Sequence, residues 1–154
     1  MAVTPNTTFI AGGVYTASQA NRFPRGLMAP PTTSTTSDTT ITAEEIMLTH
    51  TFTAVSGRNY LLVYVEPVIA GSSAGILTAR IRSGTTLAGT VLNTFKSTIA
   101  TATNTTAFVQ VIYTAASSAS LSIIATLEAS AGTATATRSA TQFPQLYALD
   151  IGIA

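Results

Sequence analysis

The sequence has no cysteine and no tryptophan, and it has one histidine, His50, and one lysine, Lys96. Without cysteine the chain forms no disulfide and no thiolate metal site. A zinc site or a nucleophile–base pair would need partners for His50, and no second histidine or thiol supplies them. We therefore predict no catalytic residue, no cofactor and no metal. We expect His50 to be a hydrogen-bonded histidine in the core or at a subunit contact.

Charged residues are also scarce, at 8% of the chain, and the formal net charge is +1. This balance gives no electrostatic reason to expect nucleic acid or a membrane surface as a partner. No apolar run approaches the roughly 18 residues of a membrane-spanning helix. A net charge near zero removes self-repulsion, so we expect a homo-oligomer, with a trimer favoured, or association with a larger particle.

The polar positions are filled mainly by threonine and serine, which suit strands and turns. In residues 46–54 the apolar side chains alternate, which places Ile46, Leu48, His50, Phe52 and Ala54 on one face. Similar segments recur to the end of the chain, separated by turn residues. The pattern predicts an all-β fold, an antiparallel β-sandwich over residues 42–154. Jelly-roll and immunoglobulin-like topologies both stay open, because the pattern does not reveal strand order.

The segment YLLVYVEPVIA, residues 60–70, is apolar at nearly every position rather than at alternate ones. A strand of this kind has no face suited to water, so it predicts a central strand or a subunit contact. Pro67 cannot donate a ladder hydrogen bond, so the ladder should end there or contain a bulge.

Residues 1–41 are predicted to be an N-terminal docking arm followed by a Pro/Thr/Ser linker. Thr16–Gln19 fits the capping box of a short helical turn, and APPTTSTTSD (residues 29–38) has little to bury. The arm combines apolar side chains with two arginines, which suits it to grooves and acidic groups on a partner. The predicted docking residues are Arg22, Phe23, Pro24, Arg25, Leu27 and Met28.

Arg80 and Arg82 are two residues apart in a predicted strand, so they share a face. They could form a solvated outer face, a subunit salt bridge or a site for an anion. Glu44 and Glu45 precede a strand, and we expect them to be solvated or paired with a neighbouring subunit. Lys96 is expected in a polar strand end or loop.

Several phrases of the sequence occur together in a known class of protein. The opening FIAGGVYTASQANRFPRGLMA resembles the start of structural proteins from tailed phages of actinobacteria. FTAVSGRNYLL, ARIRSGTTLAGT and the closing LYALDIGIA resemble later strands and hairpins of those proteins, except that Leu149 replaces an acidic residue. The matching residues of the opening and closing phrases are Thr16, Ala17, Gln19, Asn21, Pro24, Arg25, Gly26, Asp150, Ile151 and Gly152.

The resemblance implies a virion component, either a minor tail protein or a decoration or fibre protein attached to the head. It implies no catalytic residue and hence a chain that is not an enzyme. The expected partners are other virion proteins, capsid or tail subunits. A carbohydrate- or receptor-binding module of a phage fibre is the alternative function, because β-sandwiches commonly bind sugars through their loops.

Overall fold

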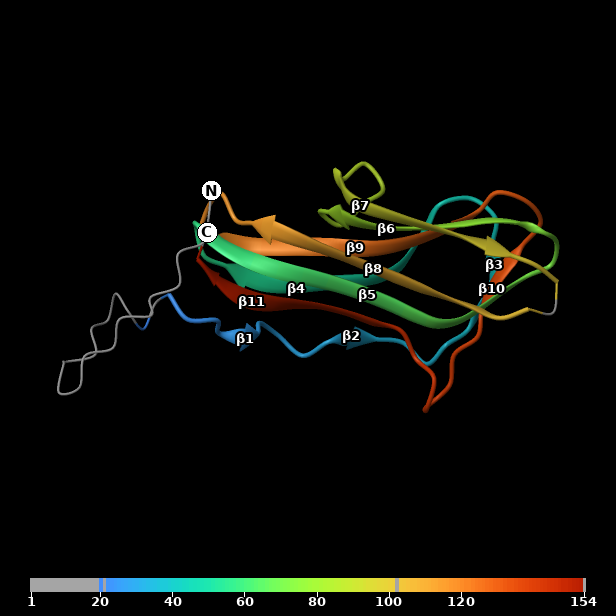
Figure 1. Ribbon diagram of the computed structural model, residues 1–154, viewed down its shortest axis with the longest axis horizontal. Coiled ribbons are helices and arrows are strands. Elements are labelled where there is room, and N and C mark those ends of the chain that lie inside the picture. The colour runs from blue at the N-terminus through green and yellow to red at the C-terminus, as the bar shows by residue number, and fades with distance from the viewer. Residues whose placement is uncertain (1–19, 21, 102, 154) are drawn as a thin grey trace.

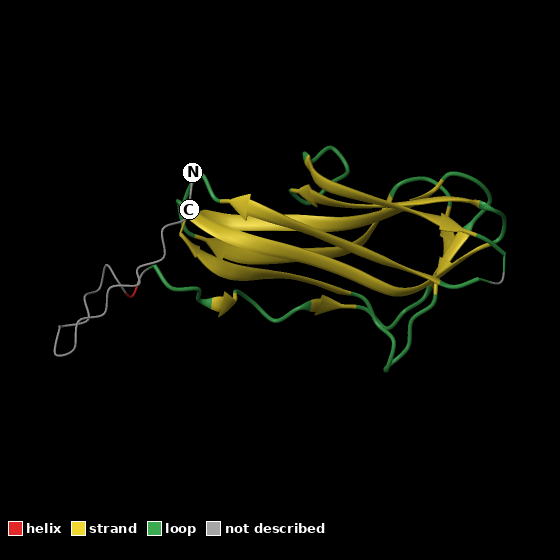
Figure 2. Cartoon of the chain, viewed as in Figure 1, coloured by secondary structure: helices red, strands yellow, loops and turns green. Residues whose placement is uncertain are grey.

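The computed structural model describes residue 20, residues 22–101 and residues 103–153. The helical turn predicted at 16–19 lies outside these residues. The described part consists almost entirely of strands and loops (Figure 2), and it holds no helix long and apolar enough to cross a membrane. Its strands are β1 (Gly26–Leu27), β2 (Thr32–Thr33), β3 (Asp38–Ile41), β4 (Glu45–Ala54), β5 (Arg58–Gly71), β6 (Gly75–Ser83), β7 (Val91–Ile99), β8 (Thr105–Thr114), β9 (Ala119–Ala129), β10 (Ala134–Ala136) and β11 (Gln145–Ile153).

The strands form two antiparallel sheets packed as a sandwich (Figure 1), which confirms the predicted fold class. Sheet B has the order β4-β9-β6-β7. In sheet A the long strand β5 pairs with β8 on one side, and with β11 and then β10 on the other. Among the strands of the described residues, only β6 and β7 are neighbours in both sequence and sheet, so most of the pairing joins distant parts of the chain.

The core lies between the inner faces of the sheets. The alternation along β4 explains which of its side chains enter the core. Leu48, His50 and Phe52 are buried there as predicted. Ile46 is 40% exposed, against the prediction, because a register shift between Ile46 and Leu48 turns Met47 inward instead. The alternation itself is intact, but the bulge moves its starting point by one residue.

Two turn and bulge predictions in the following segment are confirmed. Gly57 has a φ of 75° between β4 and β5, a conformation that a glycine adopts without steric cost. Pro67 lies where the pairing of β5 with β8 shifts register, between Glu66 and Ile69. The missing N–H of proline therefore falls at a bulge, as its chemistry requires.

The described part of the predicted arm and linker is built into the sandwich. β1 and β2 pair with β11, and β3 pairs with β10, so residues 26–41 form the outer edge of sheet A (Figure 1). The boundary after residue 41 is therefore corrected, because the linker does not separate the arm from the sheet. Thr32 and Thr33, at the start of the Thr/Ser run, satisfy their backbone groups by pairing with β11.

Two buried arginines fasten this edge to the sheet. Arg58 on β5 pairs with Asp150 on β11, with Nη2–Oδ1 at 2.7 Å, and also donates to the carbonyl of Phe23 at 2.6 Å. Although burial opposes ionisation of the carboxyl group, hydrogen bonds from Arg58 and from the Gly152 amide hold the pKa of Asp150 below its ordinary value. One guanidinium thus links β5, β11 and the chain just before β1.

Arg138, before β11, repeats this arrangement at the other end of the edge. Its Nη2 donates to Glu66 Oε2 at 2.6 Å, and its Nη1 donates to the carbonyl of Thr36 at 3.2 Å. The hydroxyl of Tyr64 donates to the same carboxylate at 3.0 Å. Burial and the neighbouring Glu66 charge raise the pKa of Tyr64 well above its ordinary value, so the phenol stays protonated.

Candidate docking surface

The outer face of sheet A carries apolar side chains, as expected from the two-faced sequence of β5. The register places Leu27 opposite Leu149, Leu149 opposite Leu61, and Leu61 opposite Ile112. Directly opposed residues point to the same side of a sheet. This row therefore crosses four strands, and its ends are open to solvent, since Leu27 is 48% and Ile112 is 61% exposed.

Two further rows continue this face along the strands. One joins Tyr147, Val63 and Gln110, and the other contains Val65 and Phe108 together with polar, uncharged neighbours. Phe108 is 46% exposed. Val63 is only 3% exposed although it points outward, so neighbouring side chains close over it. We call these three rows the apolar face.

The apolar face carries no charged side chain in any of its three rows. With strands about 4.8 Å apart and same-face residues about 7 Å apart, four strands and three rows cover about 400 Å². A monomeric protein rarely leaves a much larger apolar patch open, and patches of this size are often functional. The face therefore has the size and composition of a contact surface.

The predicted docking residues are only partly directed outward. Phe23 is exposed, and Leu27 contributes to the apolar face. Met28 is partly buried against the core, and its amide donates to the carbonyl of Ala148. It therefore does not face a partner, as the prediction had it. Arg22, Pro24 and Arg25 are exposed.

Sequence reasoning missed the contributions of β8 and β11 to this face. FVQVIYT (residues 108–114) and QLYAL (residues 145–149) place large apolar side chains on both sides of a strand. This pattern is the feature of the sequence that could have indicated a second apolar face. Only the register shows that these side chains meet those of β5.

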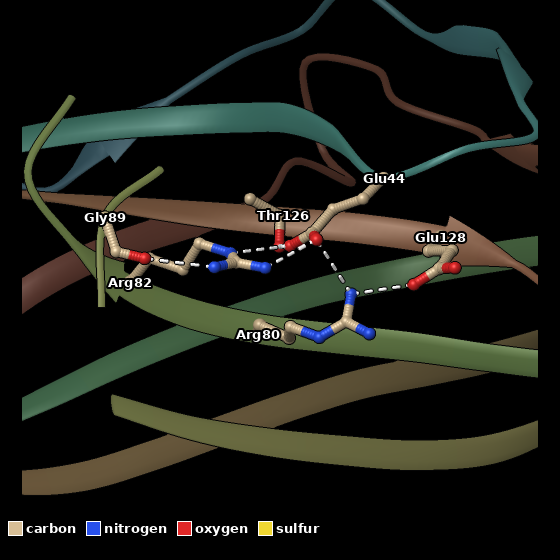
Figure 3. Close-up of polar contacts among 6 residues, drawn as sticks. All are labelled: Glu44, Arg80, Arg82, Gly89, Thr126 and Glu128. Carbon is tan, nitrogen blue, oxygen red and sulfur yellow. Dashed lines mark hydrogen bonds and ion pairs between the residues drawn. The ribbon is translucent and has the colours of Figure 1, made fainter. Parts of the chain in front are cut away.

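Arg80 and Arg82 do share a face, on the outside of sheet B, where they meet Glu44 (Figure 3). Arg82 binds Glu44 through two hydrogen bonds, Nε–Oε1 at 2.8 Å and Nη2–Oε2 at 2.6 Å. Thr126 also donates to this carboxylate, at 2.6 Å. Hydrogen bonding from Arg82 is the main cause that lowers the pKa of Glu44 to about 2. The acidic partner of Arg82 therefore belongs to the same chain and not to a neighbouring subunit.

Arg80 has a different set of contacts. Its Nη1 lies 3.2 Å from Glu44 and 2.8 Å from Glu128. Lys96, expected near a strand end or in a loop, lies within β7, opposite Thr78 and exposed.

His50 is 2% exposed, and its Nδ1 lies 3.1 Å from the hydroxyl of Thr32 on β2. The ring stacks on Phe52 with centroids 6.0 Å apart. Burial lowers the pKa of His50, so the imidazole is neutral. This agrees with the predicted core histidine. The described residues contain no group of three or more histidine and acidic side chains that could hold a metal ion.

The neutral state of His50 makes stability depend on pH. Because the pKa is lower in the folded state than the ordinary 6.5, the unfolded chain binds more protons, so stability falls as pH drops below 6.5. We expect the melting temperature to fall from pH 7.5 to pH 5.5 in the wild type and to change less in His50→Gln. Calorimetry at both pH values measures this. An equal fall in both proteins would contradict the assignment.

No protein-family model matches the sequence, and no curated protein matches it. Among solved structures, the chain is similar to a CBM4 protein, with 13% identity and a TM-score of 0.40 over 81% of this chain and 92% of that one. It is also similar to a chain of the T13 viral particle of infectious bursal disease virus (IBDV), with 12% identity and a TM-score of 0.41 over 82% of this chain. The present chain spans 37% of that viral chain. Similarities of this size carry no argument about function.

Proposed function

We propose that this chain is a non-enzymatic structural protein of a virion, attached to a capsid or tail subunit through the apolar face of sheet A. The exposure of Leu27, Phe108 and Ile112 on a surface without charge is the observation that carries the proposal. The core of a protein interface is depleted of charged residues and enriched in aromatic and aliphatic side chains. The partner surface should accordingly be apolar and uncharged.

In this proposal the N-terminal arm contributes to the contact but does not supply most of its area. The resemblance of residues 9–29 to phage structural proteins supports a virion location. Leu27 extends the apolar face to the edge of sheet A, and Arg22 and Arg25 are exposed on the chain just before β1. Acidic groups at the rim of the partner surface would pair with these arginines, while the sheet supplies the contact area.

A double variant tests the apolar face directly. Phe108→Thr with Ile112→Thr keeps residues that favour strands, and both positions are exposed, so the melting temperature should change little. We expect occupancy of the variant in purified particles to fall at least about tenfold, as loss of interface anchors produces. The measurement is quantitative mass spectrometry of particles assembled with the variant as the sole copy.

Ile46→Thr is the matched control, because Ile46 is similarly exposed but lies on sheet B. Its occupancy should equal that of the wild type. Normal occupancy of the double variant would refute the proposal. Loss of a trimer in solution, measured by light scattering, with normal occupancy would instead assign the face to contacts between copies of this chain.

A further inference from the structure

A groove of about 560 Å³ lies on the outer face of sheet B, the side of the sandwich opposite the apolar face. Its floor is a row of three directly opposed residues on β9, β6 and β7, namely Glu128, Thr78 and Lys96. Arg80 lies in the next row of β6. The volume falls in the range of small-molecule sites and would hold about one or two sugar rings.

Of the two positive side chains that line the groove, Arg80 is already paired with Glu44 and Glu128, and Lys96 is not. Within the described residues, no acidic side chain lies within ion-pair distance of the exposed Lys96. Arg80 uses only Nη1 for Glu44 and Glu128, and its Nε and Nη2 lie on the side away from Glu44 (Figure 3). The Lys96 ammonium group is thus available to a ligand, and the Arg80 side chain, which is 18% exposed, keeps Nε and Nη2 outside its ion pairs.

The remaining lining is rich in hydroxyl groups and has no aromatic ring. Thr98 and Ser130 line the groove together with Thr78 and the exposed Ile76, whereas the hydroxyl of Ser97 is buried. Glu128 presents a carboxylate whose side chain is 37% exposed. Hydroxyls and a carboxylate can bind the hydroxyls of a sugar. Without an aromatic platform, binding would depend on charge and hydrogen bonds and not on stacking.

We propose that this groove binds a saccharide that carries a carboxylate, a uronic acid unit. The carboxylate would pair with Lys96 and with the free edge of Arg80, which matches the planar, two-oxygen geometry of that group. Glu44 and Glu128 adjoin the site and would repel a phosphate dianion more strongly than a monoanion. Attachment through sheet A would leave the groove on the opposite side, but the groove's chemistry does not depend on attachment.

The test is a titration of the full chain with digalacturonic acid, followed by amide chemical shifts. We expect changes grouped at Thr78, Lys96–Thr98 and Glu128–Ser130, and an affinity at least about tenfold higher than for the neutral disaccharide of galactose. Lys96→Gln, at an exposed position, should fold normally and weaken binding about tenfold. Arg22→Gln removes an equal charge outside the groove and should leave binding unchanged.

Four outcomes would overturn the proposal: no shift up to about 10 mM ligand, equal binding of the neutral disaccharide, equal weakening by Arg22→Gln, or full competition by an equal concentration of inorganic phosphate. The last result would identify a general anion site. None of these outcomes bears on particle occupancy, so this test and the test of attachment fail independently.

Discussion

Replacing Arg138 by methionine should lower the free energy of unfolding by about 3 to 5 kcal/mol. The guanidinium makes two hydrogen bonds to the fully buried Glu66 and one to the carbonyl of Thr36. Methionine fills similar space but leaves a carboxylate without its counter-charge in the interior. Urea denaturation at pH 7 measures the change, because the midpoint shifts while the slope stays constant if the fold is kept.

A second substitution separates the buried charge from the lost packing. Adding Glu66→Gln to Arg138→Met removes the unpaired carboxylate and still offers an oxygen to the Tyr64 hydroxyl. The double variant should recover at least about half of the lost free energy. A double variant no more stable than Arg138→Met would show that the ion pair is not the source of the loss.

Replacing Arg58 by methionine should produce a similar loss, about 3 to 5 kcal/mol, and should also release β1 locally. Arg58 pairs with the buried Asp150 and holds the Phe23 carbonyl, which precedes β1. Without it, the segment keeps the two-residue ladder with β11, the backbone hydrogen bond from Arg25 to Asp150 and the packing of Met28 against the core. We expect the Met28 amide, which donates to Ala148, to exchange its hydrogen at least about tenfold faster.

Arg25→Met is the control for this experiment. Arg25 is exposed on the same segment, and its interaction with Asp150 runs through the backbone, which the substitution keeps. Its stability should lie within about 0.5 kcal/mol of the wild type. Unchanged exchange at Met28 in the Arg58 variant would mean that the arginine does not secure the edge.

Much of the strand pattern could be predicted because it depends on near neighbours. The alternation of Leu48, His50 and Phe52, the turn at Gly57 and the bulge at Pro67 each follow from the chemistry of one or two residues. The edge strands β1 to β3 could not be predicted in this way. They are two to four residues long, and their pairing partners lie about a hundred residues away.

For the candidate surfaces too, the sequence predicted the local features and missed those that depend on distant residues. The two-faced apolar sequence of β5 indicated a contact surface, but Ile112 and Leu149 join it only through register. The shared face of Arg80 and Arg82 followed from their spacing, while Glu44 as their common partner did not. Glu44 lies 38 residues from Arg82 in the chain, and no local rule connects them.

The sequence by itself determined that this chain is a β protein with few charges, no disulfide and one strand suited to apolar surroundings on both sides. Those properties come from composition and from a period of two residues, which are local. The tertiary structure alone decided that residues 26–41 belong to sheet A and that Arg58 and Arg138 fasten them. Ion pairs that span 92 and 72 residues form only after the sheets have brought their partners together, because the side chains have no local preference for each other.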